Sequence, residues 1–333
     1  VKERWPDMVR FILSGYADKE MVIQSVGPTH QFLSKPCDSD QLVGTINRAF
    51  SLRQLLQDEN VLDLVQGDCQ LPVLPELYQR LCDRLTDPES TADDVAEIIG
   101  QDVVMATKVI QLVNSAFFGM PREIHSVQQA VSLLGAEIIS SIVLTTGVFE
   151  QYSDAQIEKY DIRRLYAHSI AVGANAAAIV QAEPAVTGAK AADSAMLAGM
   201  THDFGKLIFV TAESKKWQYA HALHRNTERP LQEVEREVIG TTHAELGGYL
   251  LGLWGVTDTI VEAVAYHHNP WDAHTRDLGI LTALYLANTL TPTQYTDFAV
   301  TEPNEDYLQQ VGVAAKLDRY RAICTSNAEE STA

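Results

Sequence analysis

The chain has 333 residues, of which 46% are hydrophobic and 21% are charged, a composition typical of soluble globular proteins. It carries 25 Lys and Arg against 44 Asp and Glu, which gives a net charge of −19, and no basic run stands out. Phosphate-rich surfaces repel such a chain, so we expect neither DNA nor an anionic membrane as its partner. This length predicts about two domains.

The cysteines and the apolar runs indicate a cytoplasmic protein. The four cysteines are scattered and form no C-x-x-C pair, which favours reduced thiols over a redox or zinc site. No apolar run reaches the roughly 18 residues that a membrane span needs, and no signal peptide opens the chain. Because Val1 falls within what reads as a structured element, we expect the native protein to be longer.

The first 56 residues have an α/β pattern. Short apolar runs over residues 8–14 and 31–34 are each followed by turn residues, as in buried parallel strands. Residues 19–26 are compatible with a helix between them, which would complete a right-handed β-α-β unit. From residue 40 apolar positions recur at helical spacing, so we predict a helix that continues through a linker over residues 57–70.

This segment resembles the second half of a two-component receiver domain. The resemblance is carried by Phe11-Ile-Leu-Ser-Gly15 and Phe32-Leu-Ser-Lys-Pro36. In that family a hydroxyl residue and a lysine flank a phosphorylated aspartate, and Ser14 and Lys35 match them. The aspartate and the acidic metal cluster would lie before Val1, so the segment as it stands cannot carry receiver phosphorylation. The alternative is an α/β fragment that only packs against the rest of the chain.

From Leu71 to about Leu290 the pattern becomes helical, with no strand alternation. Three segments place a hydroxyl three residues before a carboxylate or amide, the capping-box signature: Thr91–Asp94, Ser126–Gln129 and Thr242–Glu245. Gly135 and Gly255 follow apolar helical runs and suit left-handed C′ positions. We predict an all-α domain over residues 71–290 and an acidic, less patterned tail over 291–333 that frays from residue 327.

Several candidate metal ligands are grouped at predicted helix ends. They are His202, Asp203, His243, His267 and His268, with His168 on an earlier apolar helix as a weaker candidate. Neutral imidazole and carboxylate groups suit Zn, Mn, Fe or Ni. Helix ends let side chains converge, whereas neighbours within a helix point about 100° apart. The alternative is a set of ordinary surface and core histidines.

The order of these residues resembles the HD superfamily of metal-dependent phosphohydrolases. The resemblance is carried by His202-Asp203 with Gly205-Lys206, then His243, then His267-His268, and its spacing is close to that of the HD-GYP branch, which hydrolyses cyclic di-GMP. It implies that Asp203 bridges metal ions, that the histidines complete the cluster and that Lys206 faces a substrate phosphate. In a hydrolase, Lys206 and Asp203 would then be the catalytic residues.

Two departures weaken the hydrolase interpretation. The HD family supplies a final Asp from a later helix, but this chain has Asn288, a neutral and weaker ligand. Another carboxylate would otherwise have to complete the cluster, and the one nearest in sequence to the His267-His268 pair is Asp272. HD-GYP proteins also carry an acidic residue and a Gly-Tyr-Pro loop after the histidine pair, where this chain has Asn269-Pro270-Trp271. If the alignment is correct, Asn288→Asp should strengthen metal binding.

The helical region resembles the HDOD domain more closely, over roughly residues 65–285. The resemblance is carried by four segments: Leu71–Pro75, Ile98–Asp102, Val109–Gly119 and Ser126–Gly135. Its most specific piece is Asn114-Ser115-Ala-Phe-Phe118-Gly119, where we favour helix capping over a binding role for the two polar residues. HDOD modules are bacterial signalling outputs that are commonly attached to receiver domains, and many have lost HD ligands.

We therefore favour a response-regulator-like signalling protein whose HDOD domain is an output module for a signalling protein partner. A nucleotide ligand and an oligomer stay open. The alternative is a metal-dependent phosphohydrolase that acts on a nucleotide or cyclic dinucleotide. A third hypothesis is that the domain binds a divalent metal (Fe, Mn, Zn or Ni) only to hold its helices together, or to sense metal availability or redox state.

Overall fold

A computed structural model describes residues 11–14 and 31–34, and residues 72–330 apart from short gaps at 73, 86, 88, 116–117, 119, 121–123, 187–189, 212–214, 228, 274–276 and 292–301. The chain forms two compact units that are each discontinuous in sequence. One consists of residues 1–71 and 204–265, and the other of residues 72–203 and 266–333. We call them the smaller and the larger unit.

Two short strands lie in the N-terminal segment. Strand β1 (Phe11–Ser14) pairs in parallel with β2 (Gln31–Ser34), with Phe11 opposite Gln31 and Ser14 opposite Ser34. The pairing agrees with the parallel strands predicted from the two apolar runs. The helices predicted over residues 19–26 and from residue 40, the linker, and Lys35 lie outside the described residues, so the receiver resemblance stays a prediction.

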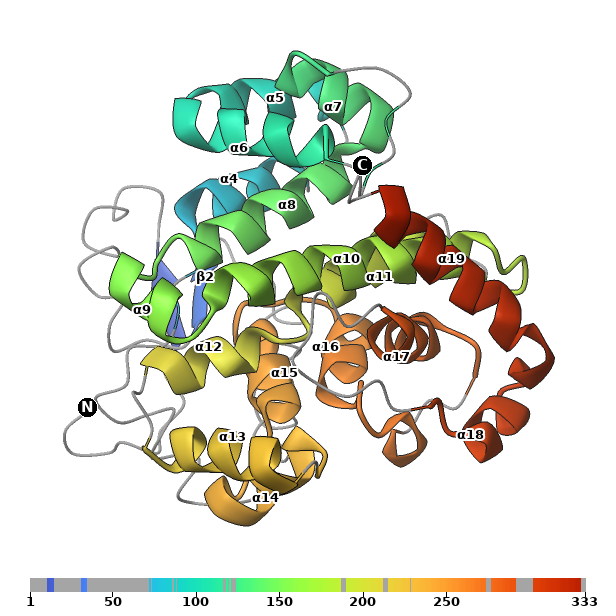
Figure 1. The fold of residues 1–333 in the computed structure, drawn as a ribbon. Helices are drawn as coiled ribbons and strands as arrows, with labels where there is room; N and C mark the ends of the chain where they lie inside the picture. The colour runs from blue at the N-terminus through green and yellow to red at the C-terminus, as the bar shows by residue number, and fades with distance from the viewer. Residues whose placement is uncertain are drawn as a thin grey trace. The chain divides into compact units, whose positions relative to one another are not determined.

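The larger unit is helical throughout its described residues, as predicted (Figure 1). Its elements are α4 (Glu76–Leu85), α5 (Ala92–Gly100), α6 (Val103–Val113), α7 (Val127–Leu134), α8 (Ala136–Phe149), α9 (Asp154–Lys159), α10 (Ile162–Gln181), α11 (Ala191–Thr201), η3 (Pro270–Asp272), α17 (Ile280–Leu290), α18 (Glu305–Gln310), η5 (Ala314–Lys316) and α19 (Leu317–Glu330). Helices α4 to α8 share an apolar core whose central side chains are fully buried: Leu81, Ile99, Val109, Ile139 and Ile142.

Local chemistry starts these helices where the sequence predicted. Thr91 and Asp94 form a reciprocal capping box at α5. At α7 the Ser126 hydroxyl accepts from the Gln129 backbone N–H, but the Gln129 side chain accepts from the His125 N–H instead, so this cap is not a full box. Gly135 joins α7 to α8 at φ 87°; its ψ of 157° is extended, so the residue is not left-handed helical as expected.

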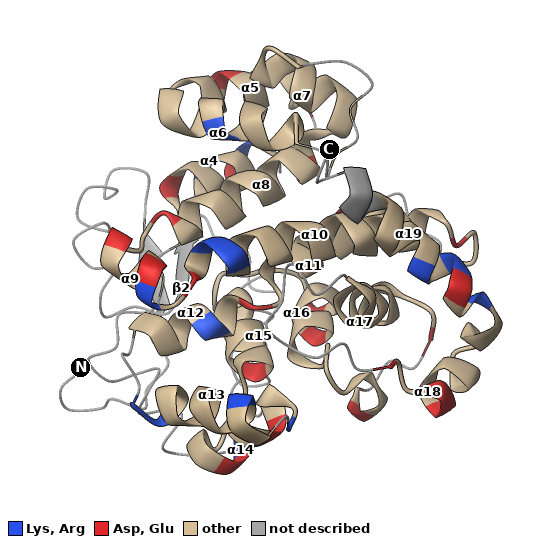
Figure 2. Ribbon diagram, in the orientation of Figure 1, with Lys and Arg blue, Asp and Glu red and all other residues tan. Residues whose placement is uncertain are grey.

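Helices α10 and α11 cross in backbone contact. A Cβ atom on Gly199 would lie 2.5 Å from the Cα of Gly173, and one on Gly173 would lie 2.6 Å from Cγ of Met200. No charged residue follows Arg164 in α10, and α17, which packs on both helices, carries none (Figure 2). Helices α10, α11 and α17 thus form a closely packed, mainly apolar group. Three of the candidate ligands lie on α10 or directly after α11.

The C-terminal segment differs from the expected unpatterned tail. Helix α19 spans Leu317–Glu330, and the fraying expected from residue 327 stays a prediction. Its Tyr320 and Cys324, one turn apart, are fully buried. The buried Glu183, just after α10, accepts from Lys316 Nζ at 2.6 Å and from Tyr320 Oη at 2.9 Å. Burial raises the pKa of Glu183, but these bonds and Arg319 outweigh it and leave that pKa below its usual value.

The smaller unit contains five helices in its described residues: α12 (Phe204–Thr211), α13 (Lys215–Thr227), α14 (Leu231–Ile239), α15 (His243–Leu253) and α16 (Asp258–Ala265). Helix α15 begins with the predicted capping box of Thr242 and Glu245. Gly255, after α15, has φ 77°, the positive value predicted for it. Helices α12 and α15 pack together, as do α13 and α14.

The predictions on membrane spans and on cysteines can be compared with the structure over the described residues. Among those residues, no helix is both long and apolar enough to cross a membrane. Cys82 and Cys324 are free thiols, and burial raises the pKa of Cys324 to about 12, which makes it unreactive near neutral pH. Cys37 and Cys69 lie outside the described residues.

Candidate metal centre

His202 and Asp203 lie directly after the last turn of α11, in the larger unit. The His202 Nδ1–H donates to the carbonyl oxygen of Gly199 at 2.7 Å. Because a carbonyl oxygen can only accept, this bond fixes the proton on Nδ1 and leaves Nε2 as the lone-pair atom of the neutral ring. The ring is fully buried. The end of α11 therefore presents a buried nitrogen ligand in one defined tautomer.

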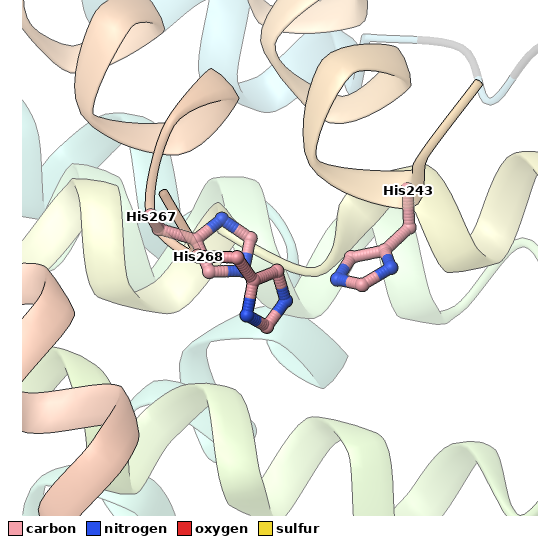
Figure 3. A group of neighbouring side chains, drawn as sticks. All are labelled: His243, His267 and His268. Atoms are coloured by element: carbon pink, nitrogen blue, oxygen red, sulfur yellow. The ribbon is translucent and has the colours of Figure 1, made fainter. Parts of the chain in front are cut away.

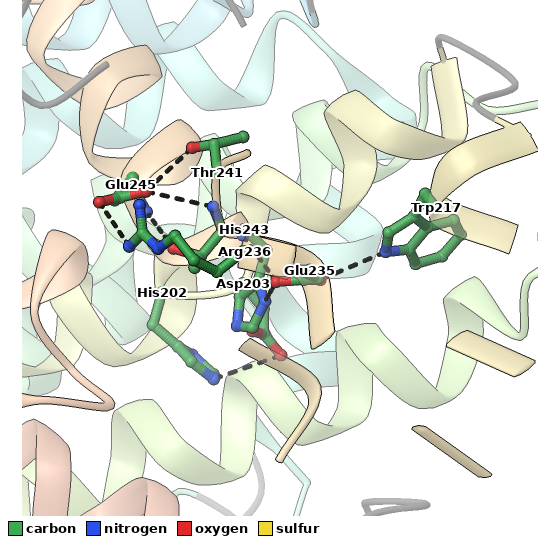
Figure 4. Close-up of polar contacts among 9 residues, drawn as sticks. His202, Asp203, Trp217, Glu235, Arg236, Thr241, His243 and Glu245 are labelled. Atoms are coloured by element: carbon green, nitrogen blue, oxygen red, sulfur yellow. Dashed lines mark hydrogen bonds and ion pairs between the residues drawn. The ribbon is translucent and has the colours of Figure 1, made fainter. Parts of the chain in front are cut away.

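The Asp203 carboxylate lies beside two imidazoles. Its Oδ2 is 3.4 Å from His202 Nε2 (Figure 4). The same oxygen is 3.9 Å from His168 Nε2. One ligand atom from each of these three residues lies within 4.8 Å of the others, and all three side chains are buried. His168 of α10, the weaker candidate from the sequence, thus belongs to the same cluster as His202 and Asp203.

Asn288 of α17 reaches the same cluster. Its side-chain amide lies 3.1 Å from His168 Nε2, and which of the two groups donates depends on the tautomer of the ring. The two residues are 120 positions apart in sequence. The amide thus lies near Asp203, where a carboxylate would have added a second negative charge.

His267 and His268 follow α16 in a short turn and belong to the larger unit. Helix α16 ends at Ala265, so both histidines lie after the helix and not within its last turn. Their ring centroids are 4.1 Å apart (Figure 3), and the His267 ring stands perpendicular to the His202 ring at 4.9 Å. His267 is 1% exposed and His268 is half-buried. The larger unit alone thus brings together four histidines and Asp203.

This donor set fits a divalent cation. Among the residues that the structure describes, His202 Nε2 has no hydrogen-bond partner, and its lone pair faces a carboxylate oxygen at a distance too long for an ordinary hydrogen bond. Two electron-pair donors that face each other are stabilised by a cation between them when both are buried away from solvent. Mixed imidazole and carboxylate donors suit first-row transition metals and zinc.

In the smaller unit, His243 is the first residue of α15 (Figure 3). The fully buried Glu235 of α14 holds it: Oε2 accepts from the His243 backbone N–H at 3.0 Å and from its ring Nδ1–H at 2.7 Å (Figure 4). The Trp217 indole N–H donates to the other carboxylate oxygen at 3.3 Å. The proton of the neutral ring is thereby placed on Nδ1, as in histidines whose Nε2 binds a metal.

Glu235 is not among the site residues predicted from the sequence, although its position in an apolar stripe is a signal that the sequence holds. Residues Leu231, Val234 and Ile239 form the buried face of α14, and Glu235 falls on the same face. A carboxylate within an apolar stripe must find buried donors. The sequence alone did not indicate that those donors would be an indole and a histidine.

Gly205 and Lys206 open α12 in the smaller unit. A Cβ on Gly205 would lie 1.8 Å from the carbonyl oxygen of His243, so only glycine lets α12 approach the start of α15. Lys206 is 7% exposed, and its assignment to a substrate phosphate stays a prediction. Asp272 is exposed at the end of η3 and is not among the clustered ligand atoms.

The helical region was compared with known protein families. Residues 71–270 match the HDOD domain, which is more than half of the chain. The chain belongs to the HDOD family.

Solved structures support the HDOD fold. An HDOD domain protein of unknown function from Geobacter sulfurreducens has a TM-score of 0.61 and 22% identity, covering 86% of this chain and 94% of that one. A Shewanella amazonensis SB2B protein named "Putative metal-dependent phosphohydrolase" has a TM-score of 0.53 and 22% identity, covering 84% of this chain and 99% of that one. At these identities the likeness shows the fold alone.

Curated relatives match over parts of their length. An uncharacterized protein of Treponema pallidum is 24% identical over 201 residues, 60% of this chain. The hydrogenase transcriptional regulatory protein HoxA of Cupriavidus necator is 35% identical over 92 residues, 27% of this chain. The chain spans 38% and 18% of the lengths of these two proteins.

The most specific HDOD segment has a structural role at Asn114. Its amide brackets the backbone of Ile124, because Nδ2 donates to the Ile124 carbonyl and Oδ1 accepts from the Ile124 N–H, both at 2.7 Å. Ser115 Oγ donates to the Leu112 carbonyl at 2.5 Å. These bonds agree with the capping role favoured from the sequence, since both polar groups fasten the backbone after α6.

Proposed function

We propose that this chain is the output module of a bacterial signal-transduction protein, and that its HDOD domain binds one divalent cation. The observation that carries the proposal is the buried pair of His202 Nε2 and Asp203 Oδ2, two electron-pair donors 3.4 Å apart within the HDOD match. The regulatory name of the HoxA relatives supports a regulatory role. We further propose a cytoplasmic location and a signalling protein as the partner.

Within the larger unit, His168, His202 and Asp203 would hold the cation, with His267 and His268 as further donors. The family resemblance assigns His243 to the same ligand set, and that assignment rests on the sequence. In a hydrolase, a bound cation would polarise a phosphate ester. Asn288 adds no charge, so the donor set favours one cation over the two or three of a phosphodiesterase.

Elemental analysis tests this proposal directly. The chain is purified without chelators and without a metal-affinity tag, then supplied in turn with Fe, Mn, Zn or Ni. We expect about one equivalent per chain, lost in His202→Ala and in Asp203→Asn. His125→Ala is the matched control, because His125 is exposed and outside the cluster. Absence of metal after reconstitution, or equal loss in His125→Ala, would contradict the metal site.

The alternative function is a metal-dependent phosphohydrolase. It is favoured by the burial of every histidine and carboxylate in the three-residue cluster, which an output module does not require. A colorimetric assay with bis(p-nitrophenyl) phosphate and a second assay with cyclic di-GMP distinguish the two. Two or more metal equivalents with turnover that disappears in His202→Ala establish a hydrolase. One equivalent without turnover supports the output module.

We also propose that residues 1–56 are receiver-like. The parallel pairing of β1 with β2 supports this, because receiver strands are parallel and Ser14 ends the first of them. An experimental structure of the N-terminal segment should place Ser14 and Lys35 at the same edge of a parallel sheet. Antiparallel strands, or a Lys35 directed to the opposite edge, would overturn the assignment.

A further inference from the structure

The larger unit contains an open cleft that involves none of the candidate metal ligands. Its volume is about 740 Å³, and its walls come from α6, α8, α9, the loop between α8 and α9 and the first turns of α10. Sites for small molecules are usually of this size, roughly 300–1,000 Å³, and are mostly apolar with a few polar groups. The volume is therefore suitable for a small ligand.

The floor of the cleft is aromatic and aliphatic. Phe149, Tyr152 and Ile162 line it and are 8%, 7% and 2% exposed. The rings of Phe149 and Tyr166 meet edge to face with centroids 5.0 Å apart. The Tyr166 and Thr146 hydroxyls are hydrogen-bonded to each other at 2.9 Å. A flat ring system would pack against these rings and have one polar pair on which to orient.

The charges at the rim favour an anion. Lys108 and Glu150 face each other in an ion pair, so their charges compensate. Arg163 also lines the cleft, is exposed, and makes no hydrogen bond or ion pair with any residue that the structure describes. Among the residues that line the cleft it leaves a net positive charge, on a chain whose net charge is −19. A guanidinium binds carboxylate, phosphate or sulfonate through paired N–H donors.

We propose that this cleft binds a small aromatic anion, a flat apolar body that carries one acidic group. The body would lie on Phe149 and Tyr166, and Arg163 would bind the acidic group. The site would give the HDOD domain a ligand-responsive surface. The proposal does not depend on the metal centre, because no proposed metal ligand lines the cleft.

Two fluorescent dyes test the proposal. 1-Anilinonaphthalene-8-sulfonate has an aromatic body with one sulfonate, and N-phenyl-1-naphthylamine has the same body without it. Each is titrated into the full chain and into Arg163→Gln. We expect Arg163→Gln to raise the Kd of the sulfonate dye about tenfold and that of the neutral dye less than about twofold. Arg164→Gln, a neighbour in α10 that does not line the cleft, should bind both dyes as the wild type does.

A second variant locates the dyes. Ile157→Trp fills the cleft from α9, and because Ile157 is only half-buried the fold should tolerate the larger ring. It should abolish saturable binding of both dyes, while Leu133→Trp on the exposed surface of α7 should not. Circular dichroism checks that both variants are folded. Absence of saturable binding by the wild type, undiminished binding by Ile157→Trp, or an equal effect of Arg163→Gln on both dyes would overturn the proposal.

Discussion

Among the residues that the structure describes, each unit buries one glutamate almost completely, and the two charges are compensated in different ways. Glu183 in the larger unit is 2% exposed and is met by two cations and a hydroxyl, from Lys316, Arg319 and Tyr320. Glu235 in the smaller unit is fully buried, and its hydrogen-bond donors are an indole, a backbone N–H and an imidazole. The first carboxylate fastens a helix, whereas the second fixes the orientation and tautomer of a histidine.

The comparison teaches that burial alone does not assign a role to a carboxylate. A glutamate paired with Lys and Arg from a distant helix stabilises the fold and leaves no group positioned for chemistry. A glutamate paired with a histidine sets which ring nitrogen is available to a ligand. By contrast, His202 is held by the backbone carbonyl of Gly199, which no side-chain substitution removes.

The largest expected effect is a loss of stability in the smaller unit, at the contact between α12 and the start of α15. Gly205→Ala would place a methyl group 1.8 Å from the His243 carbonyl oxygen, so α12 and α15 would have to separate. We expect a loss of about 4 kcal/mol or more in the free energy of unfolding, measured by urea denaturation. Gly100→Ala is the control, since nothing lies within 4 Å of a Cβ at that position. A Gly205→Ala midpoint equal to that of Gly100→Ala would contradict the close approach.

The next effect tests Glu235 as a positioning residue. Glu235→Gln turns one acceptor oxygen into a donor that faces other donors, which should cost about 2 kcal/mol of stability. The His243 ring should also lose its single tautomer, which long-range ¹H–¹⁵N spectra of the imidazole detect. His202 is the internal reference, because its tautomer is fixed by the backbone. An unchanged His243 signal would mean that Glu235 is only structural.

The third effect is a dependence on pH. The pKa of Glu183 in the folded chain lies below its usual value of 4.5, so the ionised carboxylate stabilises the fold above pH 4.5. This contribution is lost as the pH falls below 4.5 and through the lowered pKa. Glu183→Gln should therefore cost about 1.5 kcal/mol at pH 7 and progressively less on acidification. Denaturant unfolding of both proteins from pH 7 to pH 3 measures it, and a gap that widens on acidification would refute the sign.

The smallest effect adds a second carboxylate to the cluster that contains Asp203. Asn288→Asp would place a negative charge beside His168, near Asp203. Without metal we expect a loss of about 1 kcal/mol, because two carboxylates then share one site. With Mn²⁺ or Zn²⁺ we expect about tenfold tighter binding and a higher Tm than the wild type has. Calorimetric titration with metal measures this, and equal affinity would show that residue 288 does not contact the cation.

Short-range chemistry explains which features could be predicted from the sequence. The capping boxes at Thr91 and Thr242 are complete within four residues, so their helices begin where predicted. The grouping of His202 and Asp203 at a helix end follows for the same reason. Contacts between distant segments were not accessible: Glu183 meets Tyr320 across 137 positions, and the C-terminal helix depends on such contacts. The hydrogen-bond donors of Glu235 and the cleft at Arg163 likewise come together only when separate helices pack against each other.

The crossing of α10 and α11 through Gly173 and Gly199 has a consequence for how the family can change. His168 lies five residues before one glycine and His202 three residues after the other, so the gap between these imidazoles depends on the crossing. A relative could exchange these candidate ligands one at a time, but a larger residue at either crossing position would force the two helices apart at once. Small residues at both positions should therefore outlast the histidines in HDOD proteins that have lost these candidate ligands.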